Sequence, residues 1–158
     1  MKFSHEIRYA ASAADVYAML ADESFREQVC SSGGALRSSA AISQNGGGMA
    51  VEVDQTLPAT GIPSFATKFV GDEIRVVQKE SWKDGSSADL EVLIPGKPGH
   101  MRGSVSLVEN GSETVETVTG DIKVSIPLLG GKLEALIGDL LASALRNEQR
   151  VGRTWLAG

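Results

Sequence analysis

The fold is decided by TVTGDIKVSIPLLGGKLEALIGDLLASALRNEQRVGRTW, residues 117–155. Its first part, Thr117–Leu129, has the pattern of a strand, and Gly130-Gly131 ends that strand. From Lys132 to Trp155, apolar residues then recur every three or four positions, which predicts one long amphipathic helix. At about 1.5 Å per residue this helix is roughly 36 Å long, enough to cross a small domain. A chain rich in strands and closed by such a helix favours a sheet wrapped around the helix.

The composition predicts one domain over residues 1–158, with enough chain to bury a sizeable core. Hydrophobic residues make up 42% of the sequence, as in ordinary globular proteins, and the net charge is −5. Because binding to nucleic acid needs lysine and arginine to replace counterions, we expect no nucleic acid as a partner.

Residues that hold metals or form disulfides are scarce. The single cysteine, Cys30, cannot form an internal disulfide, and His5 and His100 are too few for a multi-histidine metal site. We therefore expect no metal and no other cofactor. The N-terminus lacks the apolar core of a signal peptide, and no apolar run reaches about 18 residues. A cytoplasmic protein without stable membrane insertion is expected.

The remaining pattern predicts a strand, two short helices and six further strands before the long helix. Ser12 is the expected N-cap of the first short helix, and Asp22 begins the second. Residues 63–70, between Pro58 and Gly71, are read either as a short helix or as an irregular flap. The expected strands are 2–10, 36–42, 49–57, 73–83, 86–94, 100–109 and 113–127.

The whole chain resembles the helix-grip superfamily, which includes START lipid-transfer domains, birch-pollen-allergen-like proteins and polyketide cyclases (SRPBCC). The resemblance rests on the order of the elements, on the opening MKFSHEIRYAASAADVYAML and on the join VSIPLLGGKLEALIGDLL at residues 124–141. It is close to a bacterial, largely actinobacterial, branch of unknown function. The resemblance implies an α+β helix-grip fold, in which about seven antiparallel strands curve around the C-terminal helix. In this superfamily a hydrophobic ligand usually sits between sheet and helix.

The inner face of such a sheet would carry several small residues, which leave room either for a ligand or for a closely docked helix. Glycines there can also serve only to let the sheet bend. The residues expected to bind a ligand are His5, Ile7, Ser38, Ala40, Gln55, Phe65, Phe69, Gln78, Glu80, Met101, Gly103, Gly120, Leu140 and Ala144.

Polar residues interrupt this inner face at His5, Gln78 and Glu80. A buried carboxylate needs a partner, a raised pKa or water. His5 and Glu80 could share a proton or bind a polar head group, and they are the only weak candidates for catalysis. The alternative is that Glu80 lies in solvent at a strand end and that His5 has a structural role.

Residues 58–71 contain prolines and glycines that keep the segment out of the sheet, together with Phe65 and Phe69. Because these two rings lie four residues apart, they share a face of one helical turn. We expect them to plug the open edge between sheet and helix, either as a gate or as a permanently packed plug.

The leading hypothesis is a protein that binds a small hydrophobic or lipid-like molecule without transforming it, for transport or sequestration. One rival is an enzyme of the cyclase or dehydratase type that uses His5 and Glu80 as acid and base. Another is a protein-interaction module with a filled core. An open apolar cavity favours the binder, a buried His5–Glu80 contact in a pocket favours the enzyme, and the absence of a pocket favours the interaction module.

Overall fold

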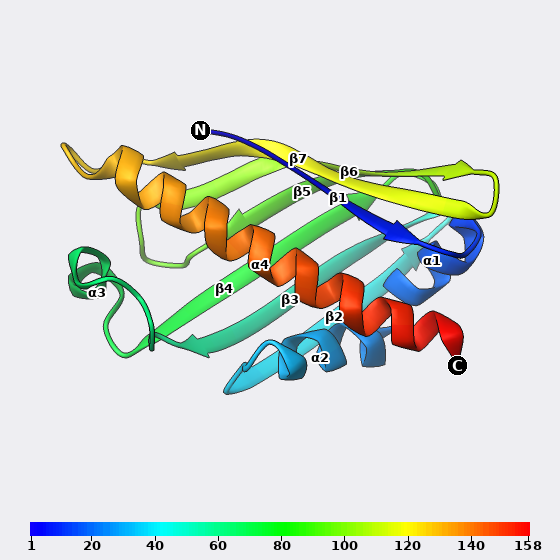
Figure 1. Ribbon diagram of the computed structural model, residues 1–158, viewed down its shortest axis with the longest axis horizontal. Coiled ribbons are helices and arrows are strands. Elements are labelled where there is room, and N and C mark those ends of the chain that lie inside the picture. Colours follow the sequence, from blue (N-terminus) through cyan, green and yellow to red (C-terminus); the bar gives the residue numbers. More distant parts are fainter.

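The computed structural model describes residues 1–158 and contains one seven-stranded sheet and four helices (Figure 1). The elements are β1 (Lys2–Tyr9), α1 (Ala13–Leu20), α2 (Glu23–Ser32), β2 (Arg37–Asn45), β3 (Gly48–Pro58), α3 (Ser64–Val70), β4 (Glu73–Trp82), β5 (Ser87–Leu93), β6 (Gly99–Asn110), β7 (Glu113–Val124) and α4 (Gly130–Ala157). None of the helices combines the length and the apolar character needed to cross a bilayer.

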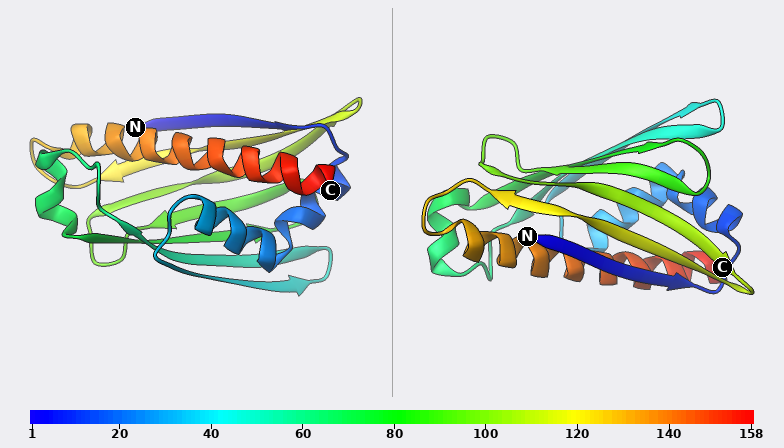
Figure 2. Two further views of the ribbon diagram at one scale, coloured as in Figure 1. Left: turned by 60° about the horizontal axis from the view of Figure 1, so that its bottom comes forward. Right: turned by 90° about the horizontal axis from the view of Figure 1, so that it is seen from above.

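The sheet is antiparallel throughout, in the order β1-β7-β6-β5-β4-β3-β2. The first strand therefore pairs with the last one, and β2 forms the opposite edge. Figure 2 shows the sheet curving around α4, with α3 near the N-terminal end of this helix. The predicted α+β helix-grip fold is confirmed.

Local sequence signals account for the starts of the two short helices. The side chain of Ser12 accepts a hydrogen bond from the Asp15 amide, and this contact caps α1. The side chain of Asp22 accepts hydrogen bonds from the Ser24 and Phe25 amides and caps α2. Each cap satisfies backbone donors that have no partner within their own helix. Both predicted caps are therefore present.

The join between β7 and α4 differs from the predicted one. The strand ends at Val124 and the helix begins at Gly130, so Gly130 belongs to the helix and does not merely end the strand. A Cβ atom on Gly130 would lie 2.6 Å from the Val124 carbonyl oxygen, which explains why glycine is needed there. Between them Leu128 adopts a φ of 67°.

Helix α4 packs closely only on the edge of the sheet that β1 and β7 form. Its close neighbours are β1, β7, α1 and α2. Glycines permit this approach: a Cβ atom on Gly152 would lie 2.7 Å from the Tyr9 ring, and one on Gly138 would lie 2.6 Å from Met1 Cε. The helix is thus held against one edge of the sheet, and space remains between it and β3, β4 and β5.

Segment 63–70 forms a helix, α3 (Ser64–Val70), which resolves the choice between helix and irregular flap. Its buried residue, Ala66, forms a small cluster with Val124 and Leu133. This cluster lies apart from the main core, which surrounds residues such as Ile7 and Trp82. The end of the molecule beside α3 therefore has its own separate packing.

Candidate functional site

A cavity of about 530 Å³ occupies the space between α4 and the middle of the sheet. Its walls come from α2, α3, α4, strands β3 to β5, the start of β6, the end of β7 and the loops before α3, β6 and α4. Of its 30 lining residues, 19 are hydrophobic. We call this space the outer cavity. The residues of α4 that line it are Leu133, Leu136, Ile137, Leu140, Leu141, Ser143, Ala144 and Asn147.

The outer cavity is open to solvent. Leu140 lines it and is nevertheless 47% exposed, and Ala144 is exposed as well. Ala144 is a small residue in the middle of a long helix, so it leaves room where a larger side chain would reach toward the sheet. An apolar space of this size with exposed apolar walls is typical of a binding site for a small molecule.

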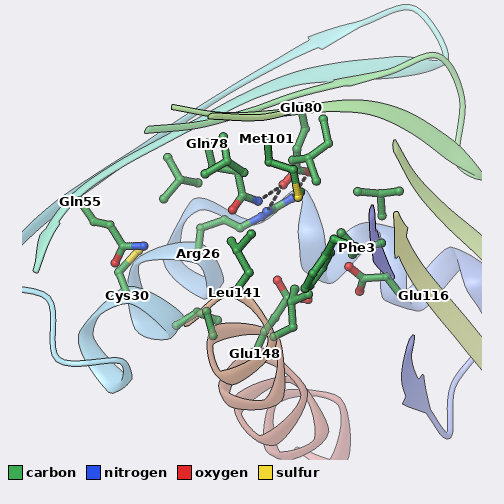
Figure 3. Close-up of a pocket in the computed structure, with 18 residues that line it drawn as sticks. Phe3, Arg26, Cys30, Gln55, Gln78, Glu80, Met101, Glu116, Leu141 and Glu148 are labelled. Atoms are coloured by element: carbon green, nitrogen blue, oxygen red, sulfur yellow. Dashed lines mark hydrogen bonds and ion pairs between the residues drawn. The ribbon is translucent and has the colours of Figure 1, made fainter. Parts of the chain in front are cut away.

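A second space of about 90 Å³, which we call the inner pocket, continues the outer cavity toward the core. The two spaces share the lining residues Gln55, Gln78, Leu141 and Ala144, among others. The inner pocket differs in character because four ionisable side chains, Arg26, Glu80, Glu116 and Glu148, line it (Figure 3).

Arg26 and Glu80 form a buried ion pair at the sheet side of the inner pocket. Two guanidinium nitrogens of Arg26 donate to the two carboxylate oxygens of Glu80, each at 2.8 Å. Trp82 Nε1 and Gln78 Nε2 donate to the same carboxylate, and Arg26 Nε donates to the Leu20 carbonyl. Burial alone would raise the pKa of Glu80, but Arg26 and these donors outweigh burial and lower it.

Glu116 and Glu148 form the opposite wall, and both are buried, with exposed fractions of 3% and 9%. Glu116 Oε1 and Glu148 Oε2 receive no hydrogen bond from the rest of the protein. Burial is the largest effect, and it raises the pKa of both carboxyls. The nearby Glu148 carboxyl raises the pKa of Glu116 further. At Glu148, the positive charge of Arg26 opposes the rise in pKa. Burial and the mutual repulsion of the two carboxyls therefore favour a form of the pair that keeps a proton.

Some of the side chains that the sequence predicted for a ligand site do line these spaces. Gln55, Gln78 and Ala144 lie where the outer cavity and the inner pocket meet. Phe69 and Leu140 line the outer cavity, and Glu80 and Met101 line the inner pocket. That a ligand touches these residues stays a prediction.

The possible contact between His5 and Glu80 is absent, and the alternative that Glu80 lies in solvent is wrong as well, because this side chain is buried. His5 is on β1 and Glu80 is on β4, and β7, β6 and β5 lie between them. With about 4.8 Å between neighbouring strands, this order separates the two backbones by roughly 19 Å. The carboxylate of Glu80 is paired with Arg26 instead. His5 is half-buried, and burial together with Arg146 lowers its pKa.

Gly103 on β6 and Gly120 on β7 line neither space. Gly103 pairs with Gly120 across the two strands, and a Cβ atom on Gly103 would lie 1.8 Å from the Thr119 carbonyl oxygen. These glycines allow a close approach of backbone, which is the alternative the sequence left open. That either glycine contacts a ligand stays an untested prediction, although neither lines the two spaces.

The other predicted lining residues also lie outside both spaces. Ile7 is fully buried within the core. Ser38 and Ala40 are on the edge strand β2, on which α2 packs. Phe65 packs with the small cluster beside α3, with Lys132 Nζ 4.9 Å from its ring centre. Only the second of the two predicted rings, Phe69, reaches the outer cavity.

Arg26, Glu116 and Glu148 were not among the predicted site residues, although the sequence carries a signal for each. Glu116 has the same strand parity as Val118 and Ile122, so it faces inward with them. Glu148 continues the apolar stripe of α4, and Arg26 lies on the inner face of α2. A charged residue at an inward-facing position of an amphipathic element is the sign that could have found all three.

Comparisons with known proteins agree with this architecture. Residues 4–156 match a family model described as "Protein of unknown function (DUF2505)". Uncharacterized proteins of Mycobacterium tuberculosis and Mycobacterium bovis are 30% identical over 109 residues, which is 65% of this chain and 62% of each relative. The chain thus matches less than two thirds of the length of these relatives.

Solved structures share the fold at low sequence identity. The protein TTHA0849 from Thermus thermophilus has a TM-score of 0.68 at 15% identity, covering 100% of this chain and 99% of its own. A truncated norcoclaurine synthase from Thalictrum flavum has a TM-score of 0.62 at 17% identity, covering 96% and 92%. A START superfamily protein from Mycobacterium smegmatis has a TM-score of 0.59 at 17% identity, covering 97% and 98%. These likenesses support the predicted helix-grip fold.

Proposed function

Because the chain belongs to the DUF2505 family of proteins of unknown function, we propose a function from its own cavity: it binds a small hydrophobic molecule between the sheet and α4. The observation that carries this proposal is the outer cavity of about 530 Å³ with mainly hydrophobic walls. Pockets for small molecules are typically about 300–1,000 Å³ in volume and mostly apolar. Transport or sequestration are the roles that such binding would serve.

The geometry of α4 supports the proposal. The helix is held by close contacts at one edge of the sheet, so the space over the middle strands is left by the architecture and not by a single small side chain. Protein interiors otherwise leave few voids larger than a water molecule. A space of this size is therefore better explained as a binding cavity than as defective packing, and it disfavours an interaction module with a filled core.

A second candidate function is acid–base catalysis on a hydrophobic substrate. The pair first expected for it, His5 and Glu80, is not assembled. Glu116 and Glu148 favour it instead, because they line the inner pocket and share a proton that one carboxyl can donate while the other accepts. Binding without turnover remains the first proposal, and the expected cytoplasmic location remains a prediction.

The experiment that tests binding replaces Ala144 with tryptophan. Ala144 is exposed and faces the cavity, so the added ring has space and should block a ligand while the fold is kept. Ala135→Trp is the matched control, because Ala135 is also exposed on α4 but does not line the cavity. Binding of a neutral hydrophobic fluorescent probe should fall about tenfold or more in Ala144→Trp only. Equal binding by the two folded variants would overturn the site.

A further inference from the structure

The inner pocket carries an excess of negative charge that the protein itself does not compensate. The positive charge of Arg26 is taken by Glu80 through two hydrogen bonds of 2.8 Å. Glu116 and Glu148 remain, and no basic side chain donates a hydrogen bond to either carboxyl. Buried carboxylates without partners are costly, and proteins normally pair them or keep them protonated. This wall of the pocket therefore has room for one more positive charge.

The two carboxyls come from different elements and reach the pocket from neighbouring sides. Glu116 extends from β7 and Glu148 from α4, and Figure 3 shows both beside Phe3, across the pocket from the Arg26–Glu80 pair. Both are more than nine-tenths buried, and each has one oxygen without a donor. These are free acceptors in the inner pocket, next to the mainly apolar outer cavity.

The volumes of the two spaces set the shape of the ligand. The inner pocket, at about 90 Å³, has room for a small polar group and a few waters, because a water occupies about 30 Å³. The outer cavity of about 530 Å³ is contiguous with it and is mainly apolar. A molecule that fills both must have a compact polar head on a larger hydrophobic body.

We propose that the inner pocket is a site for the ammonium head of an amphipathic amine, which donates hydrogen bonds to Glu116 and Glu148 while its apolar body lies in the outer cavity. This proposal rests on the function proposed above and names the class of ligand. An ammonium group has three donors and no acceptor, so it suits a carboxyl pair in which Glu116 Oε1 and Glu148 Oε2 lack donors. Charge-assisted hydrogen bonds of this kind are the stronger ones.

Other head groups fit the pocket less well. A carboxylate would face Glu116 and Glu148, and the nearest cation, Arg26, is already paired with Glu80. A hydroxyl can bond to these carboxyls but brings no charge to balance them. A divalent metal ion would need further ligands, and no group of three or more His, Cys, Asp or Glu side chains is arranged to hold one. The amine is therefore the favoured class.

The test compares three competitors with the same ten-carbon chain, namely decylamine, decan-1-ol and decanoic acid, at neutral pH. Each displaces a neutral hydrophobic fluorescent probe from the full-length protein. Decylamine should compete at a concentration about tenfold lower than decan-1-ol, the gain expected from hydrogen bonds to charged groups, and decanoic acid should be the weakest.

The variants decide whether the two carboxyls cause the preference. Glu116→Gln/Glu148→Gln should bring decylamine to the level of decan-1-ol, whereas Glu27→Gln, an exposed surface control, should keep the preference. The two single variants are measured as well. If the double variant does not fold, a reduced preference for decylamine in each single variant shows that both carboxyls contribute to it.

The outcomes separate this inference from the proposed function. Equal competition by all three compounds, or a preference that survives the loss of both carboxyls, overturns the amine site and leaves the hydrophobic cavity in place. Strongest competition by decanoic acid overturns it as well. Failure of the probe and of every competitor to bind overturns the binding function itself.

Discussion

Arg26 on α2 donates two hydrogen bonds of 2.8 Å to Glu80 on β4, and the two residues are 54 positions apart in the sequence. Both side chains are buried, so the pair fixes α2 to the middle of the sheet beside the inner pocket. Both charges of a buried ion pair have lost their hydration. If one partner is removed, the other charge therefore stays buried in the core without compensation.

The first prediction concerns this pair. Arg26→Met should lower the free energy of unfolding by about 3–5 kcal/mol, because it leaves the Glu80 carboxylate buried without its cation. The double variant Arg26→Met/Glu80→Gln should be more stable than Arg26→Met alone, since the amide carries no charge and its oxygen still accepts from Trp82 Nε1. Urea unfolding of Arg26→Met, of Glu80→Gln and of the double variant measures this. A double variant that loses the sum of the two single losses would contradict the account.

The second prediction concerns pH and the carboxyl pair. A carboxyl whose pKa is raised by folding contributes stability that is complete below its unfolded value, near 4.5, and is lost as pH rises through the folded value. Glu116→Gln cannot titrate, so its stability relative to wild type should improve by about 1 kcal/mol or more between about pH 5 and pH 8.

Urea midpoints at the two pH values measure this change, with Glu27→Gln as the exposed control. Glu80 acts in the opposite sense, because its lowered pKa gives stability that is present above the unfolded value and is lost in acid. The Glu80 contribution therefore does not produce the trend expected between pH 5 and pH 8. A constant difference between Glu116→Gln and wild type would show that folding does not raise the pKa of Glu116.

The third prediction concerns α3 as the cover of the outer cavity. Ala66 and Phe69 line the cavity, and both also belong to the small cluster in which Phe65 packs. If α3 opens to admit a ligand, the amides of residues 62–70 should exchange faster than those of β5 and β6 without ligand and slow down when decan-1-ol is added. Hydrogen exchange followed by mass spectrometry measures these rates with and without decan-1-ol. Amides that are already as protected as the central strands would identify a permanent plug.

The sequence predicted those features that depend on neighbouring residues. The caps Ser12 and Asp22, the alternation within each strand and the stripe of α4 all follow from local geometry, and the structure contains them. The end of β7 was placed too late, because the alternation in the sequence continues through Ile126, although the chain leaves the sheet after Val124.

The features that depend on strand order could not be predicted from neighbouring residues alone. Alternation shows that His5 and Glu80 face inward, but only the pairing of β1 with β7 places them at different parts of the sheet. In the same way, Glu116 and Glu148 each occupy an inward position, and their meeting requires the crossing of α4 over β7. The role of a small residue is equally ambiguous from sequence, because Gly103 allows two strand backbones to approach closely whereas Ala144 lines the cavity.

The central claim, that a hydrophobic molecule enters the outer cavity, is tested most directly by methyl NMR during a titration with decan-1-ol. Leucine methyls that line the cavity, those of Leu57, Leu136 and Leu141, should shift with saturation. The methyls of Leu20 and Leu107, which are buried in the core away from both spaces, should stay in place. Saturable shifts confined to the first group are the predicted result. Shifts that are absent at the solubility limit of the alcohol, or that appear only outside the cavity, would contradict the claim.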